Sequence, residues 1–414
     1  MSVPRINLVI VGHKDHGKST LIGRLLYDSK AIQQQKLDEI RTELKQTGRG
    51  RFRFAFLLDS LEEERRGGLT MDIMQTPFKS RKYLYTIIDC PGHREFIKKM
   101  LTGVSQADAA VLVVSAREGI QDQTRQHTFL IRTLGIRQLV IAINKMDLAE
   151  YKENRFRKTC EELEPILTNL GYKNIPMIPV SAIRGDNVYN KSPRIKWYKG
   201  PTLIETLDEN ITPSKLPANK PLRGVVQDIY FHVNNQNIIA CKIETGILKQ
   251  GQTVVFSPSG QKGNLNKILS FGTQIEKAEP GDSVGLVVDG AGDVKRGEVL
   301  SHSDDQPKIV KSFTAEIILL SDLRIMNGDE LIIRYGTAER KCRVIRILSE
   351  IDPVKLTVSS VYPEVLDKEG VGEAEFLTLE PTCIEEYSDF PELGRFVIEG
   401  KKGTAAAGIV LKIN

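Results

Sequence analysis

The chain has 414 residues and a formal net charge of +5 at pH 7, a length that suggests about two to four domains rather than one core. This mild positive charge is compatible with contact to nucleic acid or ribosomes without requiring it. The five cysteines are far apart and form no CxxC pair, which argues against a zinc site or a disulfide framework and predicts buried or incidental thiols. No run approaches the ~18 apolar residues of a spanning helix, so the sequence predicts a soluble, cytoplasmic protein that does not enter a membrane.

Up to about residue 210, short apolar runs alternate with longer amphipathic stretches. The expected strands are INLVIV, YLYTIID, AAVLVVS, LVIAIN and PMIPVS. The expected helices cover residues 19–27, 33–46, 94–103, 123–135 and 153–171. Continuous Val, Ile and Leu runs separated by helices are typical of a parallel sheet covered on both faces, so we expect residues 1–210 to form one doubly wound, mostly parallel α/β domain.

The stretch NITPSKLPANKPLRG places three prolines among polar residues, and we interpret residues 211–221 as a linker. After it come runs such as TVVFSP, SVGLVV, TAEIIL and ELIIRY, separated by turn signals at roughly ten-residue spacing, which is typical of small all-β barrels. A break near SHSDDQPKIV divides this part of the chain. We therefore expect two β-barrel domains, over residues 222–304 and 305–414.

The stretch GHKDHGKST follows the first expected strand, opens a helix and fits the pattern G-x-x-x-x-G-K-S. In this context the backbone N–H groups of the loop and of the helix N-terminus can bind a β-phosphate. Lys18 can bridge the β- and γ-phosphates, and the Ser19 hydroxyl can ligate Mg2+. A fortuitous Gly/Lys turn is the alternative. The loop residues expected to contact nucleotide are Gly12, Asp15, His16, Gly17, Lys18, Ser19 and Thr20.

A second element, IIDCPGH, ends a strand with Asp89, which can hold Mg2+ through water, and Gly92 can offer its N–H to a γ-phosphate. Thr70 can close over the γ-phosphate and give its hydroxyl to Mg2+, or it simply begins a strand. His93 can position or polarise the attacking water, with a structural histidine as the alternative. Ser19, Thr70 and Asp89 are thus the expected metal ligands.

The third element, NKMD, lies at the carboxyl end of an apolar strand, where open parallel sheets bind ligands. Asp147 can accept from the N1–H and amino group of guanine, and such a carboxylate rejects adenine by about 10^4 or more. Asn144 can bond the base and brace the loop, and the Lys145 stem can lie over the base. Ser181 and Ala182 follow the last strand, where a backbone N–H can meet the guanine oxygen. The four elements together indicate GTP with Mg2+.

With these motifs assembled, the chain resembles the translational GTPases, most closely archaeal and eukaryotic elongation factor 1-alpha, nearly end to end. The resemblance rests on GHKDHGKSTLIGRLL, DCPGHREFIKKMLTGVSQADAAVLVVSA, QTRQH, NKMD, GDNV with WYKGPTL, AEPGDSVG, VKRGEVL and FPELGRFVI. It implies a GTPase domain followed by two β-barrels, and Mg2+-dependent hydrolysis of GTP to GDP, stimulated by the ribosome with His93 positioning water. It also implies delivery of aminoacyl-tRNA or of a protein that mimics tRNA, and leaves room for a nucleotide-exchange factor.

The chain departs from the family pattern at NNQNIIACK, residues 234–242, where the family has a glycine-rich stretch that helps frame the aminoacylated end of tRNA. In the first switch, RRGG replaces RERG at residues 65–68. One alternative is therefore a ribosome-rescue or termination GTPase without aminoacyl-tRNA delivery. Another is the GTPase subunit of sulfate adenylyltransferase with a sulfurylase-type partner, and a third is a GTP-dependent binding module with negligible turnover.

Lys14 stands where the resembling family usually carries valine, beside the path of the catalytic histidine toward the water. A lysine here can supply a mobile cation where negative charge develops on the transferring phosphoryl group. The alternative is that its stem packs as valine would while the ammonium reaches solvent. The residues expected to act in hydrolysis are His93, Lys18, Thr70 and Lys14.

Overall fold

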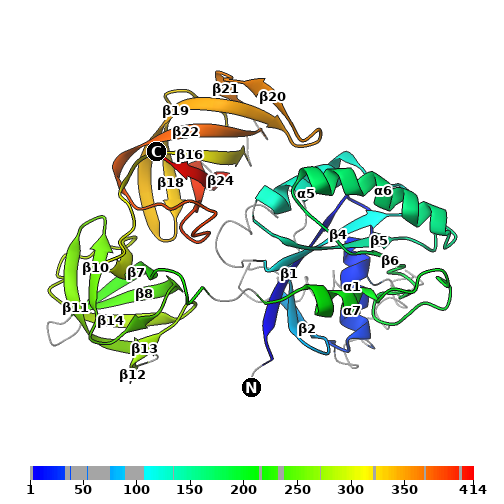
Figure 1. Cartoon of the computed structure of the whole chain (residues 1–414), viewed down its shortest axis with the longest axis horizontal. Coiled ribbons are helices and arrows are strands. Elements are labelled where there is room, and N and C mark those ends of the chain that lie inside the picture. Colours follow the sequence, from blue (N-terminus) through cyan, green and yellow to red (C-terminus); the bar gives the residue numbers. More distant parts are fainter. Residues whose placement is uncertain are drawn as a thin grey trace. The chain divides into compact units, whose positions relative to one another are not determined.

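The computed structural model describes the chain in two compact units, Met1–Ser214 with Pro353–Leu356, and Lys215–Asp352 with Thr357–Asn414 (Figure 1). The described residues are 3–32, 38, 54, 75–88, 107–133, 135–213, 217–231, 237–270, 272–319, 323–367, 370–400 and 403–414. The helices expected over residues 33–46 and 94–103 lie outside them, apart from Asp38.

A six-stranded sheet forms the centre of the first unit, in the order β2-β3-β1-β4-β5-β6. Neighbouring strands are parallel except β2, which is antiparallel to β3. The strands are β1 (Arg5–Gly12), β2 (Gln75–Lys79), β3 (Leu84–Ile88), β4 (Ala109–Ser115), β5 (Gln138–Asn144) and β6 (Met177–Pro179). The helices are α1 (Lys18–Asp28), α5 (Asp122–Thr133), α6 (Glu153–Asn169) and α7 (Leu203–Asn210). The expected doubly wound, mostly parallel domain is confirmed.

Helices cover both faces of this sheet, with α1 and α7 over one face and α5 and α6 over the other (Figure 1). Every residue of β4 is buried, which explains its unbroken apolar sequence. By contrast, α1 buries one side only, through Leu21, Ile22, Leu25 and Leu26. None of the helices in the described part of the chain is long and apolar enough to cross a lipid bilayer.

Two elements of the first unit were not expected from the sequence. β2 contains Pro77 and lies at the sheet edge, where a residue without an N–H is tolerated, but its sequence QTPFK has no apolar run. α7 begins with a capping box in which Thr202 and Glu205 each bond the other's backbone N–H. That local signal was present, but eight residues are too few for a clear helical period.

Two closed β-barrels form the second unit, as expected. The first closes through β10-β15-β7-β8-β14-β11 and the β10–β11 pairing, and the second through β18-β23-β24-β16-β22-β19 and the β18–β19 pairing. The strands of the first barrel region are β7 (Arg223–Phe231), β8 (Asn237–Thr245), β9 (Leu248–Lys249), β10 (Thr253–Ser257), β11 (Gln261–Ser270), β12 (Thr273–Ile275), β13 (Lys277–Ala278), β14 (Ser283–Asp289) and β15 (Val299–His302). Those of the second are β16 (Val310–Leu319), β17 (Ile325–Met326), β18 (Glu330–Tyr335), β19 (Ala338–Asp352), β20 (Thr357–Val361), β21 (Val365–Leu366), β22 (Val371–Thr382), β23 (Arg395–Gly400) and β24 (Gly403–Ile413).

Alternate residues of the strands fill the interior of each barrel. In the second barrel Phe313 stacks on Phe376, with ring centroids 5.2 Å apart, and Phe396 meets both rings edge-on. Cys241 lies in the core of the first barrel and Cys342 in that of the second, and both are free thiols. Both are fully buried, so the expectation of buried thiols is confirmed for these two residues, and burial raises the pKa of the Cys342 thiol to about 12.

Arg223, the first residue of β7, fastens the two barrels together. Its Nε donates to Glu385 Oε1 at 2.8 Å, across the boundary between the barrels. Its Nη1 donates to the carbonyl oxygens of Leu222 and Asp305, each at 2.9 Å. The guanidinium also lies 4.8 Å from the ring centroid of Phe390. Arg223 is only 3% exposed, so this buried cation depends on all of these partners.

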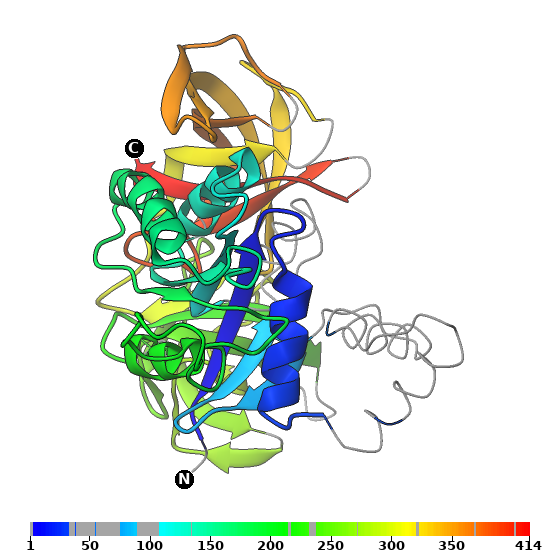
Figure 2. The same ribbon diagram turned by 90° about the vertical axis from the view of Figure 1, so that its right-hand side faces the viewer.

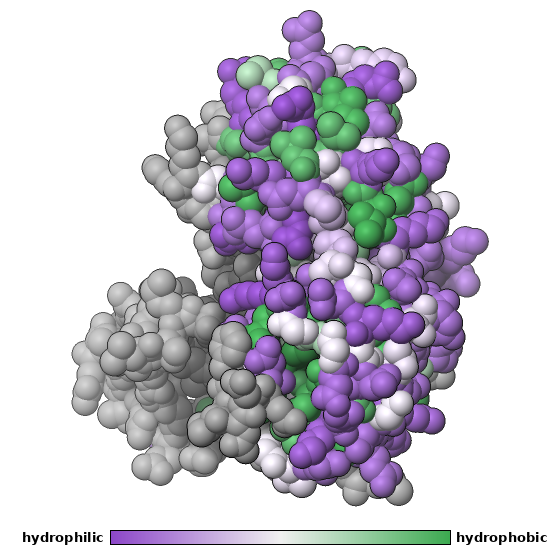
Figure 3. Space-filling view, turned by 90° about the vertical axis from the view of Figure 1, so that its left-hand side faces the viewer, coloured by the Kyte–Doolittle hydropathy of each residue, from purple (hydrophilic) through white to green (hydrophobic). Residues whose placement is uncertain are grey.

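An apolar contact reinforces the Arg223 pair. Val225 and Val299 of the first barrel pack with Cys383 and Leu393 of the second. The outer surface is different in character: the face turned to the viewer in Figure 3 is mainly hydrophilic, with small separate groups of hydrophobic side chains.

We expect Arg223→Met to weaken the contact between the barrels by about 3–5 kcal/mol, because it leaves Glu385 partly buried without its cation. Hydrogen exchange in peptides covering residues 222–231 and 383–398 should become faster by a factor on the order of 10^2. Arg334→Met is the matched control, since the half-exposed Arg334 pairs with Glu339 and Glu399 of its own barrel and should contribute less than about 1 kcal/mol per pair. Equal exchange rates in the two variants would contradict this account.

Candidate functional site

The chain between β1 and α1 forms a tight loop at the carboxyl edge of the sheet. Figure 2 shows β1 running toward this loop and α1 returning alongside it. Gly12 and Gly17 have φ angles of 145° and 92°. A Cβ atom on Gly12 would lie 2.2 Å from the carbonyl oxygen of Val113, and one on Gly17 would lie 2.5 Å from Nδ2 of Asn144. Both positions therefore require glycine.

The first turn of α1 combines backbone donors with a fixed cation. The N-cap residue is Gly17, which has no side chain to cap the N-terminal N–H groups, and the first turn holds no acidic residue. Lys18 Nζ donates to the carbonyl oxygens of Gly12 and His13 at 2.8 and 3.0 Å, which keeps the ammonium above the loop. This arrangement can bind a phosphate.

The loops after β5 and β6 meet the glycine-rich loop through one side-chain amide. Asn144 Nδ2 donates to the carbonyl oxygen of His16 at 2.9 Å, and Asn144 Oδ1 accepts from the N–H of Ala182 at 2.9 Å. The hydroxyl of Ser181 donates to Asp147 Oδ1 at 2.6 Å. Because Asn144 already engages the Ala182 N–H, a guanine oxygen bound there would have to share this donor.

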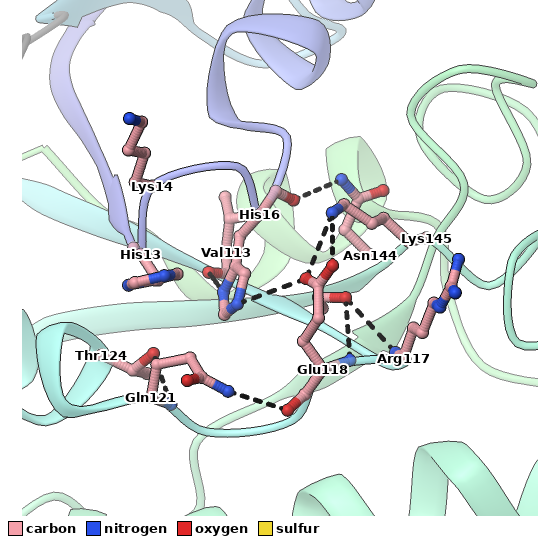
Figure 4. Close-up of polar contacts among 12 residues, drawn as sticks. His13, Lys14, His16, Val113, Arg117, Glu118, Gln121, Thr124, Asn144 and Lys145 are labelled. Atoms are coloured by element: carbon pink, nitrogen blue, oxygen red, sulfur yellow. Dashed lines mark hydrogen bonds and ion pairs between the residues drawn. The ribbon is translucent and has the colours of Figure 1, made fainter.

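Lys145 is held at the rim of these loops by a carboxylate (Figure 4). Its Nζ lies 3.1 Å from each carboxylate oxygen of Glu118, in the turn after β4. The Ser115 hydroxyl accepts from the Glu118 N–H and fixes that turn. Burial acts to raise the pKa of the Glu118 carboxyl, but hydrogen bonds from Ser115 and Lys145 outweigh it and the pKa lies below its ordinary value. The Lys145 stem is thereby fixed along the sheet edge.

Two side chains of α5 support the glycine-rich loop. The Gly12 N–H donates to His127 Nδ1 at 3.2 Å, and the Lys14 N–H donates to Gln123 Oε1 at 2.7 Å. Their i, i+4 spacing in QTRQH places both on one helix face. Neither residue was predicted as part of the site, although this spacing is visible in the sequence. The Lys14 side chain is exposed and points away from Glu118 (Figure 4).

The described residues predicted for the site gather at the carboxyl edge of the sheet, on three loops and the start of α1. They are Gly12, Lys14, Asp15, His16, Gly17, Lys18, Ser19, Thr20, Asn144, Lys145, Asp147, Ser181 and Ala182. Four other predicted residues, Thr70, Asp89, Gly92 and His93, lie outside the described residues. Within the described ranges, no three His, Cys, Asp or Glu side chains gather in a way that could hold a metal ion.

His16 is fully buried against β4. Its Nδ1 lies 3.3 Å from the carbonyl oxygen of Val113, and its Nε2 lies 3.7 Å from Glu118 Oε2. Burial is the main cause that lowers the pKa of His16 to about 4, and the charges of His13 and Lys145 add to it. The Val113 carbonyl and Glu118 oppose this shift without cancelling it. The imidazole is therefore neutral at pH 7.

The comparisons with known proteins agree along the whole chain. Residues 3–213 match the family described as "Elongation factor Tu GTP binding domain", residues 237–301 match "Elongation factor Tu domain 2", and residues 312–411 match "GTP-eEF1A C-terminal domain-like". The chain is 42% identical over 412 residues to "Elongation factor 1-alpha" of Thermoplasma acidophilum, covering 98% of this chain and 97% of the relative. The chain belongs to the elongation factor 1-alpha family.

Another elongation factor 1-alpha aligns with this chain over a similar share of its length. The protein of Methanocaldococcus jannaschii is 43% identical over 422 residues, covering 99% of this chain and 98% of the relative. A solved structure of Sup35 complexed with GDP is 28% identical, with a TM-score of 0.47, covering 100% of this chain and 95% of that chain.

Membership in the elongation factor 1-alpha family establishes the activity. The chain is a GTP-binding GTPase of the elongation factor type, and it acts in protein biosynthesis. The predictions of a translational GTPase and of GTP and GDP as its nucleotides are confirmed. Factors of this type work with the ribosome and tRNA, which favours the translation-factor prediction over the sulfate adenylyltransferase alternative.

We expect His16 to make the first unit less stable in mild acid. Its folded pKa of about 4 lies below the unfolded value of about 6.5, so the unfolded chain binds a proton first as the pH falls. The free energy of unfolding should therefore fall by about 2 kcal/mol between pH 7 and pH 5.

The measurement is urea unfolding with GDP present, followed by the fluorescence of Trp197, the single tryptophan, which lies in the first unit. The variant His16→Gln should lack this part of the pH dependence. Parallel pH profiles for the wild type and His16→Gln would show that His16 is not the responsible group.

Proposed function

We propose that this elongation factor 1-alpha family member is a Mg2+-dependent GTP switch that carries tRNA, or a protein that mimics tRNA, to the ribosome. The observation that supports the proposal is the convergence of the loops after β1, β5 and β6 at one edge of the sheet. This convergence occurs in a chain that aligns with elongation factor 1-alpha over 98% of its length.

In this proposal the base lies between the loops after β5 and β6. Asp147 accepts from the N1–H and the amino group of guanine, and the Ser181 hydroxyl fixes the plane of its carboxylate. Asn144 braces the two loops against the glycine-rich loop through His16 and Ala182. The stem of Lys145, whose ammonium is held by Glu118, covers one face of the base.

The phosphates lie on the loop of residues 12–20. The uncapped N–H groups of α1 and the Lys18 ammonium compensate their charge. Ser19 presents a hydroxyl in the same turn, and a hydroxyl together with phosphate oxygens suits Mg2+, so we assign Ser19, Thr70 and Asp89 as its protein ligands. The ion, when bound, neutralises charge that develops on the phosphate oxygens.

The hydrolytic step in this proposal uses Gly92 and His93 beside the γ-phosphate. The Gly92 N–H contacts a γ-phosphate oxygen, and the His93 side chain positions the attacking water. Thr70 closes over the γ-phosphate in the GTP state. These three roles rest on sequence position, because the residues lie outside those that the structure describes.

We propose that the chain consists of a GTPase domain over residues 1–210, a linker over 211–221 and two barrels over 222–304 and 305–414. The barrels would present the cargo. Within the stretch 234–242, residues 237–242 belong to β8 (Asn237–Thr245), an ordinary barrel strand with alternating burial. In this strand the chain therefore differs from the family pattern in its side chains and not in its fold. This departure is the reason to retain a protein cargo, as in rescue or termination, beside aminoacyl-tRNA. A nucleotide-exchange factor is a further proposed partner.

We expect ribosomes to accelerate single-turnover GTP hydrolysis on the order of 10^3-fold or more, as when a partner completes a phosphoryl-transfer site. Hydrolysis of radiolabelled GTP would be followed with and without purified ribosomes. The variant His93→Ala should lose most of the stimulation while keeping GDP affinity. Turnover that ribosomes leave unchanged would contradict the proposal.

A second assay, hydrolysis of the aminoacyl ester of tRNA, distinguishes the two kinds of cargo. If the GTP form carries aminoacyl-tRNA, it should slow hydrolysis of the aminoacyl ester, and the GDP form should not. Ribosome-stimulated turnover without such protection would assign a protein cargo instead.

We propose that Lys14 alters the gating of hydrolysis, either by stabilising the transferring phosphoryl group or by repelling a protonated His93. Its backbone is fixed by Gln123, while its exposed ammonium is free to move. Lys14→Val should change the single-turnover rate by about 3- to 10-fold, equivalent to a charge effect of about 1 kcal/mol, with GDP affinity nearly unchanged.

The control is Lys14→Arg, which keeps the charge and should behave like the wild type. Equal hydrolysis rates for Lys14→Val and the wild type, with and without ribosomes, would leave Lys14 as a surface residue.

A further inference from the structure

Several hydrogen bonds join the two loops proposed to hold the base, and two groups of them are formed by the carboxylates of Asp147 and Asp186. One is the Ser181 to Asp147 hydrogen bond together with Asn144, close to the proposed base. The other lies farther along both loops, at the buried carboxylate of Asp186, which is 3% exposed. Nothing in the proposed function uses Asp186.

The Asp186 carboxylate accepts from three donors that come from two segments. Tyr151, at the end of the loop after β5, donates its hydroxyl to Oδ2 at 2.8 Å. Ser192 Oγ and Arg194 Nη1 donate to Oδ1 at 2.7 and 2.9 Å. Hydrogen bonds to a charged group are shorter and stronger than neutral ones, so these three donors hold the Asp186 carboxylate in one orientation.

Asp186 also pairs with Ser181 at the start of its own loop, the loop after β6. Its N–H and carbonyl pair with those of Ser181, each hydrogen bond being 3.1 Å long, which closes the turn that carries Ala182. A shift of Asp186 would therefore move Ser181, and with it the hydroxyl that donates to Asp147.

At its other end the junction restrains a loop with an unfavourable backbone. Lys145, Glu150 and Tyr151 all have positive φ angles, between 54° and 61°, which non-glycine residues adopt only when neighbours hold them. The Tyr151 N–H donates to Met146 O at 2.8 Å, and the Tyr151 carbonyl accepts from Trp197 Nε1 at 2.8 Å. The hydroxyl bond to Asp186 completes this restraint.

We propose that Asp186 is a positioning residue for base recognition: through Tyr151 and Ser181 it sets the spacing between Asp147 and the loop that carries Ala182. The proposal rests on the proposed assignment of Asp147 to the base. Asp186 does not itself touch the nucleotide in this account. Its loss should weaken the reading of the guanine edge more than the binding of phosphates.

The readout is the ratio of the dissociation constants of IDP and GDP. IDP lacks the amino group that would donate a hydrogen bond to Asp147, while its phosphates are the same as those of GDP. The ratio therefore reports recognition of the base alone. In Asp186→Asn we expect the ratio to fall about 10-fold, the effect of losing about one well-formed hydrogen bond. Tyr151→Phe, which removes only one hydroxyl, should lower the same ratio by a smaller factor. This variant still tests the proposal if Asp186→Asn does not fold.

Asp208→Asn is the matched control. Asp208 is a buried aspartate of the same unit, and its Oδ1 accepts from Ser80 Oγ at 2.6 Å and from Tyr85 Oη at 3.2 Å. Tyr85 lies near the start of β3, at the sheet edge opposite the loops. This variant should lose stability, measured by Trp197 fluorescence, yet keep the IDP to GDP ratio within about twofold of the wild type.

Asp147→Asn separates failure of this proposal from failure of the base assignment, since it should abolish the preference for GDP. If Asp147→Asn retains that preference, the base assignment fails and the role of Asp186 fails with it. If Asp147→Asn loses the preference while Asp186→Asn and Tyr151→Phe keep it, only the role of Asp186 is overturned. Equal loss in Asp186→Asn and Asp208→Asn would also overturn it, because general destabilisation would then suffice.

Discussion

The carboxamide of Asn144 is the interaction on which the rest of the site depends. It joins the carbonyl of His16 to the N–H of Ala182, so three loops from three strands share one planar group. The fit is tight, because a Cβ atom at Gly17 would lie 2.5 Å from Nδ2. An exchange of Gly17 for alanine would therefore disturb the phosphate loop and the base loops together. In the proposed site, this amide would support the loops for both the base and the phosphates of the nucleotide.

Other polar side chains hold the neighbouring loop residues in place. Glu118 fixes Lys145, His127 fixes Gly12, and Asp186 fixes Tyr151. Each is supplied by a different segment, and each fixes a residue at the loop edge. Parallel sheets favour this arrangement because the carboxyl ends of all their strands lie along one edge.

The sequence was sufficient where the signal was local. The apolar runs predicted β1, β4 and β5, and the spacing of Gly12, Gly17 and Lys18 predicted the loop between β1 and α1. Contacts across the chain had no such signal. Tyr151 and Asp186 are 35 positions apart, and only the strand order brings them together. The same reason hid the role of Glu118, whereas the helical spacing of His127 was visible in the sequence and was missed. The roles of Thr70, Asp89, Gly92 and His93 stay predictions.

The buried guanidinium of Arg223 has a mechanical consequence for the chain after the linker. Because Arg223 is bonded on both sides of the boundary between the barrels, and an apolar contact lies beside it, bending at this boundary would expose an unpaired charge. These contacts therefore oppose movement of one barrel relative to the other.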